Sequence, residues 1–211
     1  WDSTAGNLLL SIVLRPCVDP AKYSGLAAVS GLAVLEALKR RGLTTEIGLK
    51  WPNDLVARGR KLGGILVEAA RDNEGKPFAV CGIGVNLNYT PQDVPDGGLA
   101  AIGLSDLNES VPSVDTLLDE VYQTVMDSVD AWAEQLNALA DNAGPLAPVR
   151  EDYIAQLNWI EEHVIARSPA GDELAQGIFK TVDTFGRACI ETEGGLRSFH
   201  FEEASLRPVS E

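Results

Sequence analysis

The stretch KWPNDLVARGRKLGGILVEA, residues Lys50–Ala69, differs clearly from a generic surface hairpin. It joins a Trp-Pro-Asn-Asp turn, several basic residues, two adjacent glycines and an apolar strand. The segments Leu55–Arg58 and Lys61–Ala70 bracket a tight turn at Gly59-Arg60, and the β-prone segment Thr45–Trp51 precedes them. Turn residues between short apolar runs predict a β-hairpin that follows a strand.

The polar residues of this stretch suit chemistry that a surface hairpin does not need. Lys61 lies just before Gly63 and Gly64, where the missing Cβ atoms let a ligand approach the backbone. A lysine at that place is a point charge suited to a carboxylate or phosphate oxygen. Asn53 and Asp54 offer an amide and a carboxylate on one turn, and the aspartate suits Mg²⁺ binding or proton acceptance.

A second glycine-containing strand is predicted at Phe78–Tyr89, with Gly82, Gly84 and then Asn86. If it pairs with the strand Lys61–Ala70, the glycines of both form a floor without side chains. Each feature alone has a structural explanation as a turn, a bulge or close helix packing. Their combination favours a binding site for a ligand with an apolar body and an anionic end.

The composition is that of a globular protein, with 211 residues of which 45% are hydrophobic and 23% charged. The net charge of −14 disfavours binding to nucleic acid or to anionic membranes. Residues 50–76 are an exception, because six basic and four acidic residues give this segment a charge of +2. The chain shows no signal peptide or membrane-length apolar run, and Cys17, Cys81 and Cys189 are expected to be buried free thiols of a cytoplasmic protein.

Two regions of different pattern predict an α+β fold with two domains. In residues 1–157, strand patterns alternate with helical patterns at 22–42 and 113–139, which indicates a mixed or antiparallel sheet flanked by helices. The apolar stripe of the second helix includes Trp132 and Leu139, and Ser113 suits its N-cap. In residues 158–211, short strands at regular spacing predict a small barrel or sandwich.

The stretch Lys50–Ala69 closely resembles the signature of the biotin protein ligase family. GIGVNLN at 82–88, NLLLSIVLRP at 7–16 and ASLRP at 204–208 resemble further strands of that family, so the resemblance covers essentially the whole chain. It implies a sheet like that of class II aminoacyl-tRNA synthetases, shared with lipoate ligases, followed by a small SH3-like β-barrel. Trp1 resembles the residue that follows the family's Gly-Arg-rich loop, so we expect the N-terminal part of the catalytic domain to be missing here.

The resemblance also implies a reaction in two steps. Biotin and ATP, with Mg²⁺, form biotinyl-5′-AMP and pyrophosphate, and the biotinyl group then passes to a lysine of a biotin carboxyl carrier domain. That carrier belongs to acetyl-CoA carboxylase or a related carboxylase. No DNA or membrane partner is expected for this chain, and the sequence leaves homodimerisation open.

The resemblance assigns roles to individual residues. Lys61 matches the lysine that neutralises the biotin carboxylate and the α-phosphate, and Asp54 matches the second catalytic residue and a metal ligand. The implied biotin-binding residues are Lys61, Gly63, Gly64, Ile65, Gly82 and Gly84. The implied nucleotide-binding residues are Asn53, Asn86 and Arg207.

Two alternative functions are weighed against this one. A lipoate or octanoate ligase or transferase shares the broader fold, but the Lys-Trp-Pro-Asn-Asp block and the small C-terminal domain favour biotin. A non-catalytic biotin-binding or regulatory module would not need a phosphate-binding end. The presence of Lys61 together with Asn53 and Asp54 therefore favours an enzyme.

Overall fold

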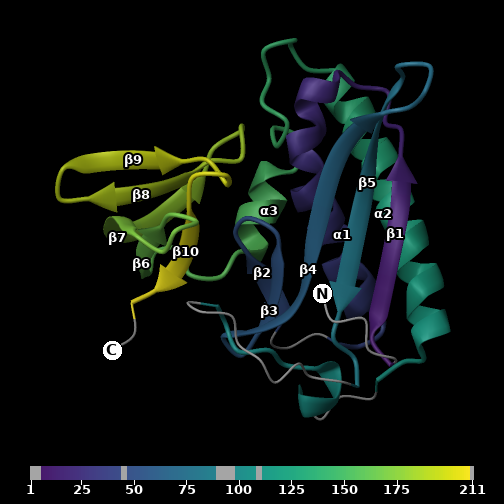
Figure 1. The fold of residues 1–211 in the computed structure, drawn as a ribbon, viewed down its shortest axis with the longest axis horizontal. Coiled ribbons are helices and arrows are strands. Elements are labelled where there is room, and N and C mark those ends of the chain that lie inside the picture. The colour runs from purple at the N-terminus through teal and green to yellow at the C-terminus, as the bar shows by residue number, and fades with distance from the viewer. Residues whose placement is uncertain (1–5, 44–46, 89–97, 108–110, 210–211) are drawn as a thin grey trace.

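The computed structural model describes residues 6–43, 47–88, 98–107 and 111–209. Its larger sheet is antiparallel and has the strand order β1-β5-β4-β3-β2 (Figure 1). The five strands are β1 (Leu8–Leu14), β2 (Ile47–Lys50), β3 (Asp54–Ala57), β4 (Arg60–Arg71) and β5 (Pro77–Val85). The sheet predicted as mixed or antiparallel is thus antiparallel in all of its described strand pairs.

The β3–β4 hairpin turns at Arg58-Gly59, one residue earlier than predicted. Both residues have positive φ angles, 49° and 69°. Positive φ at both central positions matches the right-handed twist of the two flanking strands, and glycine adopts it without strain. The hairpin predicted from the stretch Lys50–Ala69 is therefore confirmed.

Helices cover one face of the larger sheet (Figure 1). They are the 3₁₀ helix η1 (Pro20–Gly25), α1 (Leu26–Arg40), α2 (Val114–Asn137) and α3 (Arg150–Gln156), while the 3₁₀ helix η2 (Leu104–Leu107) lies past one end of the sheet (Figure 1). Helix α1 packs closely on the sheet because it has glycine at position 31, where a Cβ would lie 3.4 Å from the side chain of Leu49. Gly25 has a different neighbour, because its Cβ would meet the carbonyl oxygen of Pro145.

Helix α2 follows the predicted amphipathic pattern. The Ser113 hydroxyl accepts a hydrogen bond from the amide of Thr116, as expected of the N-cap. The apolar stripe is buried through Trp132 to Leu136. Leu139 was predicted to continue the stripe but is exposed, because the helix ends at Asn137.

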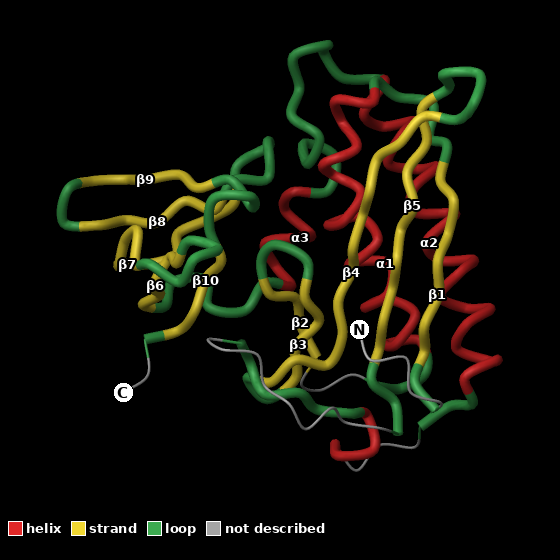
Figure 2. The backbone as a smooth tube through the Cα atoms, in the orientation of Figure 1, coloured by secondary structure: helices red, strands yellow, loops and turns green. Residues whose placement is uncertain are grey.

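The C-terminal region forms a second antiparallel sheet with the order β10-β6-β7-β8-β9 (Figure 2). Its strands are β6 (His163–Arg167), β7 (Glu173–Val182), β8 (Ala188–Thr192), β9 (Gly195–Phe199) and β10 (Ser205–Pro208). Within the described residues no backbone pairing joins β9 to β10, so the sheet is open and a closed SH3-like barrel is not confirmed. The three cysteines are free as predicted, but Cys17, which follows β1, is exposed rather than buried.

Replacing Gly63 by alanine is expected to lower the free energy of unfolding by about 2 kcal/mol, a typical cost of overpacking a dense interior. A Cβ at this position would lie 2.4 Å from the carbonyl oxygen of Gly84. The matched control is Gly82→Ala on the adjacent strand, where the nearest atom is the carbonyl oxygen of Leu66 at 3.7 Å. Urea unfolding measures both variants, and equal losses of stability would contradict this packing.

Candidate active site

One row of residues crosses the larger sheet and brings the predicted site together. Lys50 is opposite Asp54, Asp54 is opposite Gly64, Gly64 is opposite Gly84, and Gly84 is opposite Leu9. Directly opposed residues of antiparallel strands point to the same face of a sheet. The side chains of Lys50 and Asp54 therefore stand beside Gly64 and Gly84, two positions that have no side chain.

The glycine floor, defined as Gly64, Gly82 and Gly84, lies on the face of the sheet that the helices leave open. Gly82 is opposite Leu66 in the next row, and the Leu66 side chain is 54% exposed. Leu9 is also exposed on this face. The two glycine-containing strands, whose pairing the sequence left open, do pair, and apolar side chains flank the floor.

Two residues predicted to bind biotin point to the other face of the sheet. The side chain of Ile65 is buried and reaches the position of Gly31 on α1. A Cβ on Gly63 would meet the buried side chain of Leu55. The main chain of Ile65 is also engaged, because its amide donates to the Asn53 carbonyl and its carbonyl accepts from the Asn53 side chain at 2.7 Å.

A β-bulge places Lys61 on the same face as the glycine floor. In the register of β3 and β4, Leu55 is opposite Gly63 but Val56 is opposite Lys61, so Leu62 is an extra residue. If side chains alternated regularly along β4, Leu62 would lie on the open face and Lys61 on the face that the helices cover. Leu62 is in fact fully buried. The alternation of the sequence alone would therefore have placed this lysine on the wrong face.

The carboxylate of Asp54 is shared by two lysines. Its Oδ1 lies 2.6 Å from the ammonium of Lys61, and its Oδ2 lies 3.2 Å from the ammonium of Lys50. The Lys50 side chain is 3% exposed and that of Lys61 is 38% exposed. Lys50 is therefore an internal counter-ion, while Lys61 presents its charge toward the open face.

The pKa values in this group follow from burial and from the neighbouring charges. Burial alone would raise the pKa of the Asp54 carboxyl, but the charges and hydrogen bonds of Lys50 and Lys61 outweigh it and lower that pKa. Burial lowers the pKa of Lys50 despite the opposing charge of Asp54, and the charge of Arg207 lowers it further. Arg207 comes from β10, so the smaller sheet adds a third cation. We call Lys50, Lys61, Arg207 and Asp54 the charge cluster.

Asn86 ends the second glycine-containing strand, and its side chain is used inside the protein. The residue is 2% exposed, and its amide donates to the carbonyls of Lys61 at 3.4 Å and Ile102 at 3.2 Å. Its backbone amide donates to the carbonyl of Leu62. Asn86 therefore holds the backbone of the bulged segment through hydrogen bonds, a role that its sequence position did not indicate.

Two buried aromatic residues also support the turn between Lys50 and Asp54. The indole N–H of Trp51 donates to the carbonyl of Gly186 at 2.9 Å, and the Tyr153 hydroxyl donates to the carbonyl of Pro52 at 2.8 Å. Burial raises the pKa of Tyr153, so its hydroxyl stays protonated and remains a donor. Sequence reasoning gave neither residue a role, because each acts through a partner far away in the chain.

The described residues contain no cluster of three or more His, Cys, Asp or Glu side chains that could hold a metal ion. Asp54 is the carboxylate nearest the glycine floor among the predicted site residues, and lysines already contact both of its oxygens. Mg²⁺ usually takes oxygen ligands from one or two carboxylates together with substrate phosphates. These residues thus do not form a metal centre on their own.

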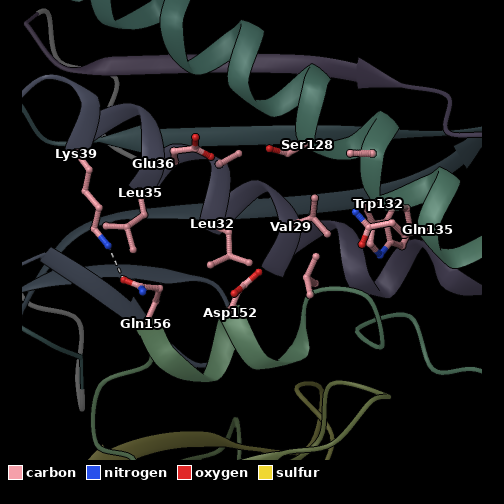
Figure 3. Close-up of a pocket in the computed structure, with 13 residues that line it drawn as sticks. Val29, Leu32, Leu35, Glu36, Lys39, Ser128, Trp132, Gln135, Asp152 and Gln156 are labelled. Carbon is pink, nitrogen blue, oxygen red and sulfur yellow. Dashed lines mark hydrogen bonds between the residues drawn. The ribbon is translucent and has the colours of Figure 1, made fainter.

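A groove of 380 Å³ lies elsewhere, between α1, α2 and α3 (Figure 3). It is lined by Leu32, Trp132 and polar residues such as Asp152, and Lys39 bonds Gln156 at its edge. None of the predicted site residues lines it.

No helix built from the described residues has the length and apolarity needed to cross a membrane.

Comparisons with known proteins find similarity to biotin protein ligases. Residues 1–88 match the biotin/lipoate A/B protein ligase family, and residues 160–207 match the biotin protein ligase C-terminal domain. The chain is 33% identical to biotin–[acetyl-CoA-carboxylase] ligase of Mycobacterium tuberculosis, over 92% of this chain and 67% of that protein. It is 30% identical to the ligase of the same name from Paracoccus denitrificans, over 92% of this chain and 78% of that protein.

A solved structure shows the same fold. Biotin protein ligase from Aquifex aeolicus in complex with biotin and ATP superposes with a TM-score of 0.77. The match covers 99% of this chain and 82% of that protein, at 23% sequence identity. The arrangement of two sheets with helices on one side is therefore shared with that structure.

The variant Asp54→Asn is expected to lose about 3 kcal/mol of unfolding free energy near neutral pH, because the buried Lys50 ammonium loses its counter-ion. The pKa of Asp54 is lower in the folded protein than in the unfolded chain. Its carboxylate thus contributes stability above the unfolded pKa, and that contribution is lost as the pH falls through the folded pKa. The stability of the variant should therefore decline less steeply in acid, as measured by urea unfolding across pH.

The control for this variant is Glu36→Gln, which breaks an exposed pair with Arg40 at the same spacing of four residues. Its expected cost is less than about 1 kcal/mol, as for other surface pairs. Equal losses for the two variants would show that the Asp54 carboxylate is not a buried counter-ion.

Proposed function

The chain belongs to the biotin protein ligase family, and from that premise we propose that it joins biotin to a carrier protein at the expense of ATP. Biotin and ATP form biotinyl-5′-AMP and pyrophosphate in the first step. The biotinyl group is then transferred to a lysine of a biotin carboxyl carrier domain. The single observation that carries this proposal is the ammonium of Lys61, held by Asp54 next to the glycine floor.

The glycine floor suits the body of biotin. Gly64 and Gly84 are directly opposed, so the fused rings of biotin can lie close to the backbone there. The exposed side chains of Leu9 and Leu66 flank this area and offer apolar contact. We propose that the biotin carboxylate points toward Lys61, at the end of the floor where the charges are.

The first step brings two anions together. A carboxylate oxygen of biotin forms a bond to the α-phosphorus of ATP, and the bond from that phosphorus to the bridging oxygen of pyrophosphate breaks. Positioning and positive charge supply most of the catalysis in such a reaction. The charge cluster has three cations and one carboxylate, and Lys61 is the lysine that faces the open side.

Asp54 acts in this proposal by placing Lys61. A carboxylate whose pKa is lowered by two lysines is a weak base, so it is poorly suited to remove a proton from the carrier lysine. Its two oxygens hold one lysine each, which fixes the ammonium of Lys61 in front of Gly64.

We assign the nucleotide end of the site to Asn53, Asn86 and Arg207. Burial lowers the pKa of Arg207 and the charge of Asp54 opposes this, so Arg207 lies near enough to Asp54 to face the same ligand. The side chains of Asn53 and Asn86 each donate to a backbone carbonyl of β4, so we propose that they shape the nucleotide end. In the same way, Gly63 and Ile65 contribute to biotin binding by holding the backbone of the floor in place.

Mg²⁺ would arrive with ATP and would reduce the negative charge of its phosphates. Asp54 offers a single carboxylate to it, and that carboxylate contacts two lysines. We propose that the phosphates are the main ligands of this ion.

The two sheets correspond to the proposed domains. Residues 1–157 form the catalytic domain, and residues 158–211 form a small domain of the SH3-like type that supplies Arg207. The partner is a carrier domain of acetyl-CoA carboxylase or a related carboxylase, and homodimerisation is an additional proposal. An ATP-dependent reaction and three free cysteines fit a cytoplasmic location.

The variant Lys61→Gln is expected to reduce biotin-dependent pyrophosphate release at least about 100-fold, the usual effect of removing one group that stabilises transition-state charge. The control is Arg60→Gln, which removes an exposed neighbouring cation and should leave the rate within about twofold because it lies outside the charge cluster. Similar rates for Lys61→Gln and the unmodified protein would contradict the assigned role.

Substrate choice separates the proposed function from its alternatives. With ATP and Mg²⁺ present, the protein should release pyrophosphate with biotin and at least about tenfold more slowly with lipoate or octanoate, because discrimination by a shaped pocket reaches that size. Faster release with lipoate would identify a lipoate ligase. Binding of labelled biotin without any pyrophosphate release would identify a non-catalytic module.

A further inference from the structure

The turn that joins β2 to β3, which we call the site turn (Lys50–Asp54), carries two members of the charge cluster. Trp51 and Pro52 lie directly between Lys50 and Asp54 in the chain. The ammonium of Lys50 also donates to the carbonyl of Trp51 at 3.4 Å. A displacement of Trp51 would therefore move both ends of the pair that holds Lys61.

The site turn is fixed from outside its own sheet. The indole N–H of Trp51 donates to the carbonyl of Gly186, which lies between β7 and β8 of the smaller sheet. From α3, Tyr153 donates its hydroxyl hydrogen to the carbonyl of Pro52. Trp51 is only 2% exposed, and removing its indole N–H takes away the hydrogen bond that ties the site turn to Gly186.

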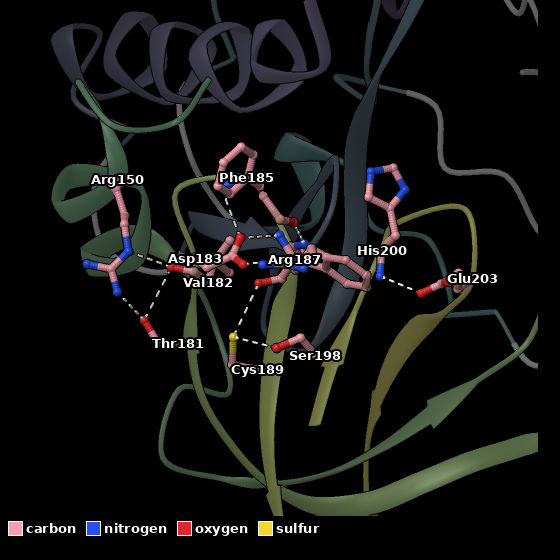
Figure 4. A network of polar contacts seen from close by, with 12 residues as sticks. Arg150, Thr181, Val182, Asp183, Phe185, Arg187, Cys189, Ser198, His200 and Glu203 are labelled. Atoms are coloured by element: carbon pink, nitrogen blue, oxygen red, sulfur yellow. Dashed lines mark hydrogen bonds and ion pairs between the residues drawn. The ribbon is translucent and has the colours of Figure 1, made fainter. Parts of the chain in front are cut away.

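The segment that accepts this hydrogen bond is held by hydrogen bonds of its own. We call it the docking turn (Asp183–Arg187). The Asp183 carboxylate accepts from the amides of Phe185 and Arg187 and pairs with the Arg187 guanidinium at 2.6 Å (Figure 4). Gly186 has a φ of 85°, which glycine adopts without strain. The carbonyl that receives the indole is thus held in one orientation.

The docking turn is also attached to the catalytic part of the chain. Arg150 at the start of α3 donates to the carbonyl of Val182 at 2.6 Å and to the hydroxyl of Thr181 at 2.9 Å (Figure 4). The amide of Leu146 donates to the carbonyl of Thr184 at 2.9 Å. These bonds fix the position of the docking turn relative to α3, so the docking turn can hold the site turn.

We propose that Trp51 is a positioning residue, which acts through its hydrogen bond to Gly186 to keep Asp54, and through it Lys61, in register with the glycine floor. Tyr153 supports the same turn from α3. This role rests on the proposed adenylation reaction. With this role of Trp51, the smaller sheet contributes to the first chemical step in two ways, through Gly186 and through Arg207. Small displacements of a charged group in such a step cost rate more than they cost substrate binding.

The test compares Trp51→Phe with a matched control, Trp132→Phe. Trp132 is 1% exposed, and its indole N–H donates to the carbonyl of Pro145 at 2.8 Å, so the control loses the same kind of bond. It lies on α2, and its acceptor Pro145 is outside the site turn. The next residue, Leu146, bonds Thr184 of the docking turn, but the bonds of Asp183 and Arg150 hold that turn without Trp132. Tyr153→Phe is a second variant that removes the other hydrogen bond to this turn.

Steady-state pyrophosphate release is measured with biotin and ATP at a temperature where all variants are folded. We expect Trp51→Phe to lower kcat about tenfold while the KM for biotin stays within about twofold, since the floor is unchanged. Tyr153→Phe should lower kcat by a smaller factor. Trp132→Phe should keep the kcat of the unmodified protein, even if its melting temperature falls by as much as that of Trp51→Phe.

Amide hydrogen exchange across residues 50–55 gives a second readout that does not depend on activity. Exchange there should increase in Trp51→Phe and stay unchanged in Trp132→Phe. Unchanged exchange in Trp51→Phe, or a kcat equal to that of Trp132→Phe, would overturn the positioning role. If the unmodified protein released no pyrophosphate, the proposed function would fail, and the exchange measurement would still decide whether Trp51 holds the site turn.

Discussion

The carboxylate of Asp54, shared between Lys50 and Lys61, is the interaction on which the site depends. One of its oxygens contacts a lysine sealed inside the protein, and the other contacts a lysine that faces the open side of the sheet. A buried carboxylate needs such partners to remain charged. In return it fixes the position of the outer ammonium next to a patch of bare backbone. A protein with a net charge of −14 thereby presents local positive charge where two anions have to meet.

The sheet supplies the geometry that makes this interaction useful. The register sets Asp54, Gly64 and Gly84 in one row, and the bulge at Leu62 turns Lys61 to the same face. Helices cover the opposite face, so the glycine floor is open to a ligand (Figure 1). The second sheet adds Arg207 and a carbonyl that holds Trp51. The proposed active site is thus a product of both sheets, although most of its proposed residues come from one short stretch of sequence.

Much of this arrangement could be predicted from the sequence, because it depends on local pattern. The hairpin and the long amphipathic helix follow from residue spacing and turn residues, whereas the pairing of the glycine-containing strands was left open. The exact place of Lys61 did not follow, because a bulge shifts the alternation of side chains by one residue. The contacts of Asn86, Trp51 and Tyr153 could not be predicted either, since their partners come from distant segments whose approach no local pattern specifies. The open smaller sheet shows the same limit, because regular strand spacing does not determine whether the edges of a sheet pair.

The central claim is that the charge of Lys61 is matched to the carboxylate of biotin, and a thermodynamic cycle tests it most directly. Isothermal titration calorimetry measures the affinity of biotin and of its neutral amide, biotinamide, for the unmodified protein and for Lys61→Gln. The account predicts that the unmodified protein prefers biotin over biotinamide by at least about tenfold, and that this preference is lost when the lysine is neutral. A preference of the same size in both proteins would contradict it, because the carboxylate would then be recognised by some other group.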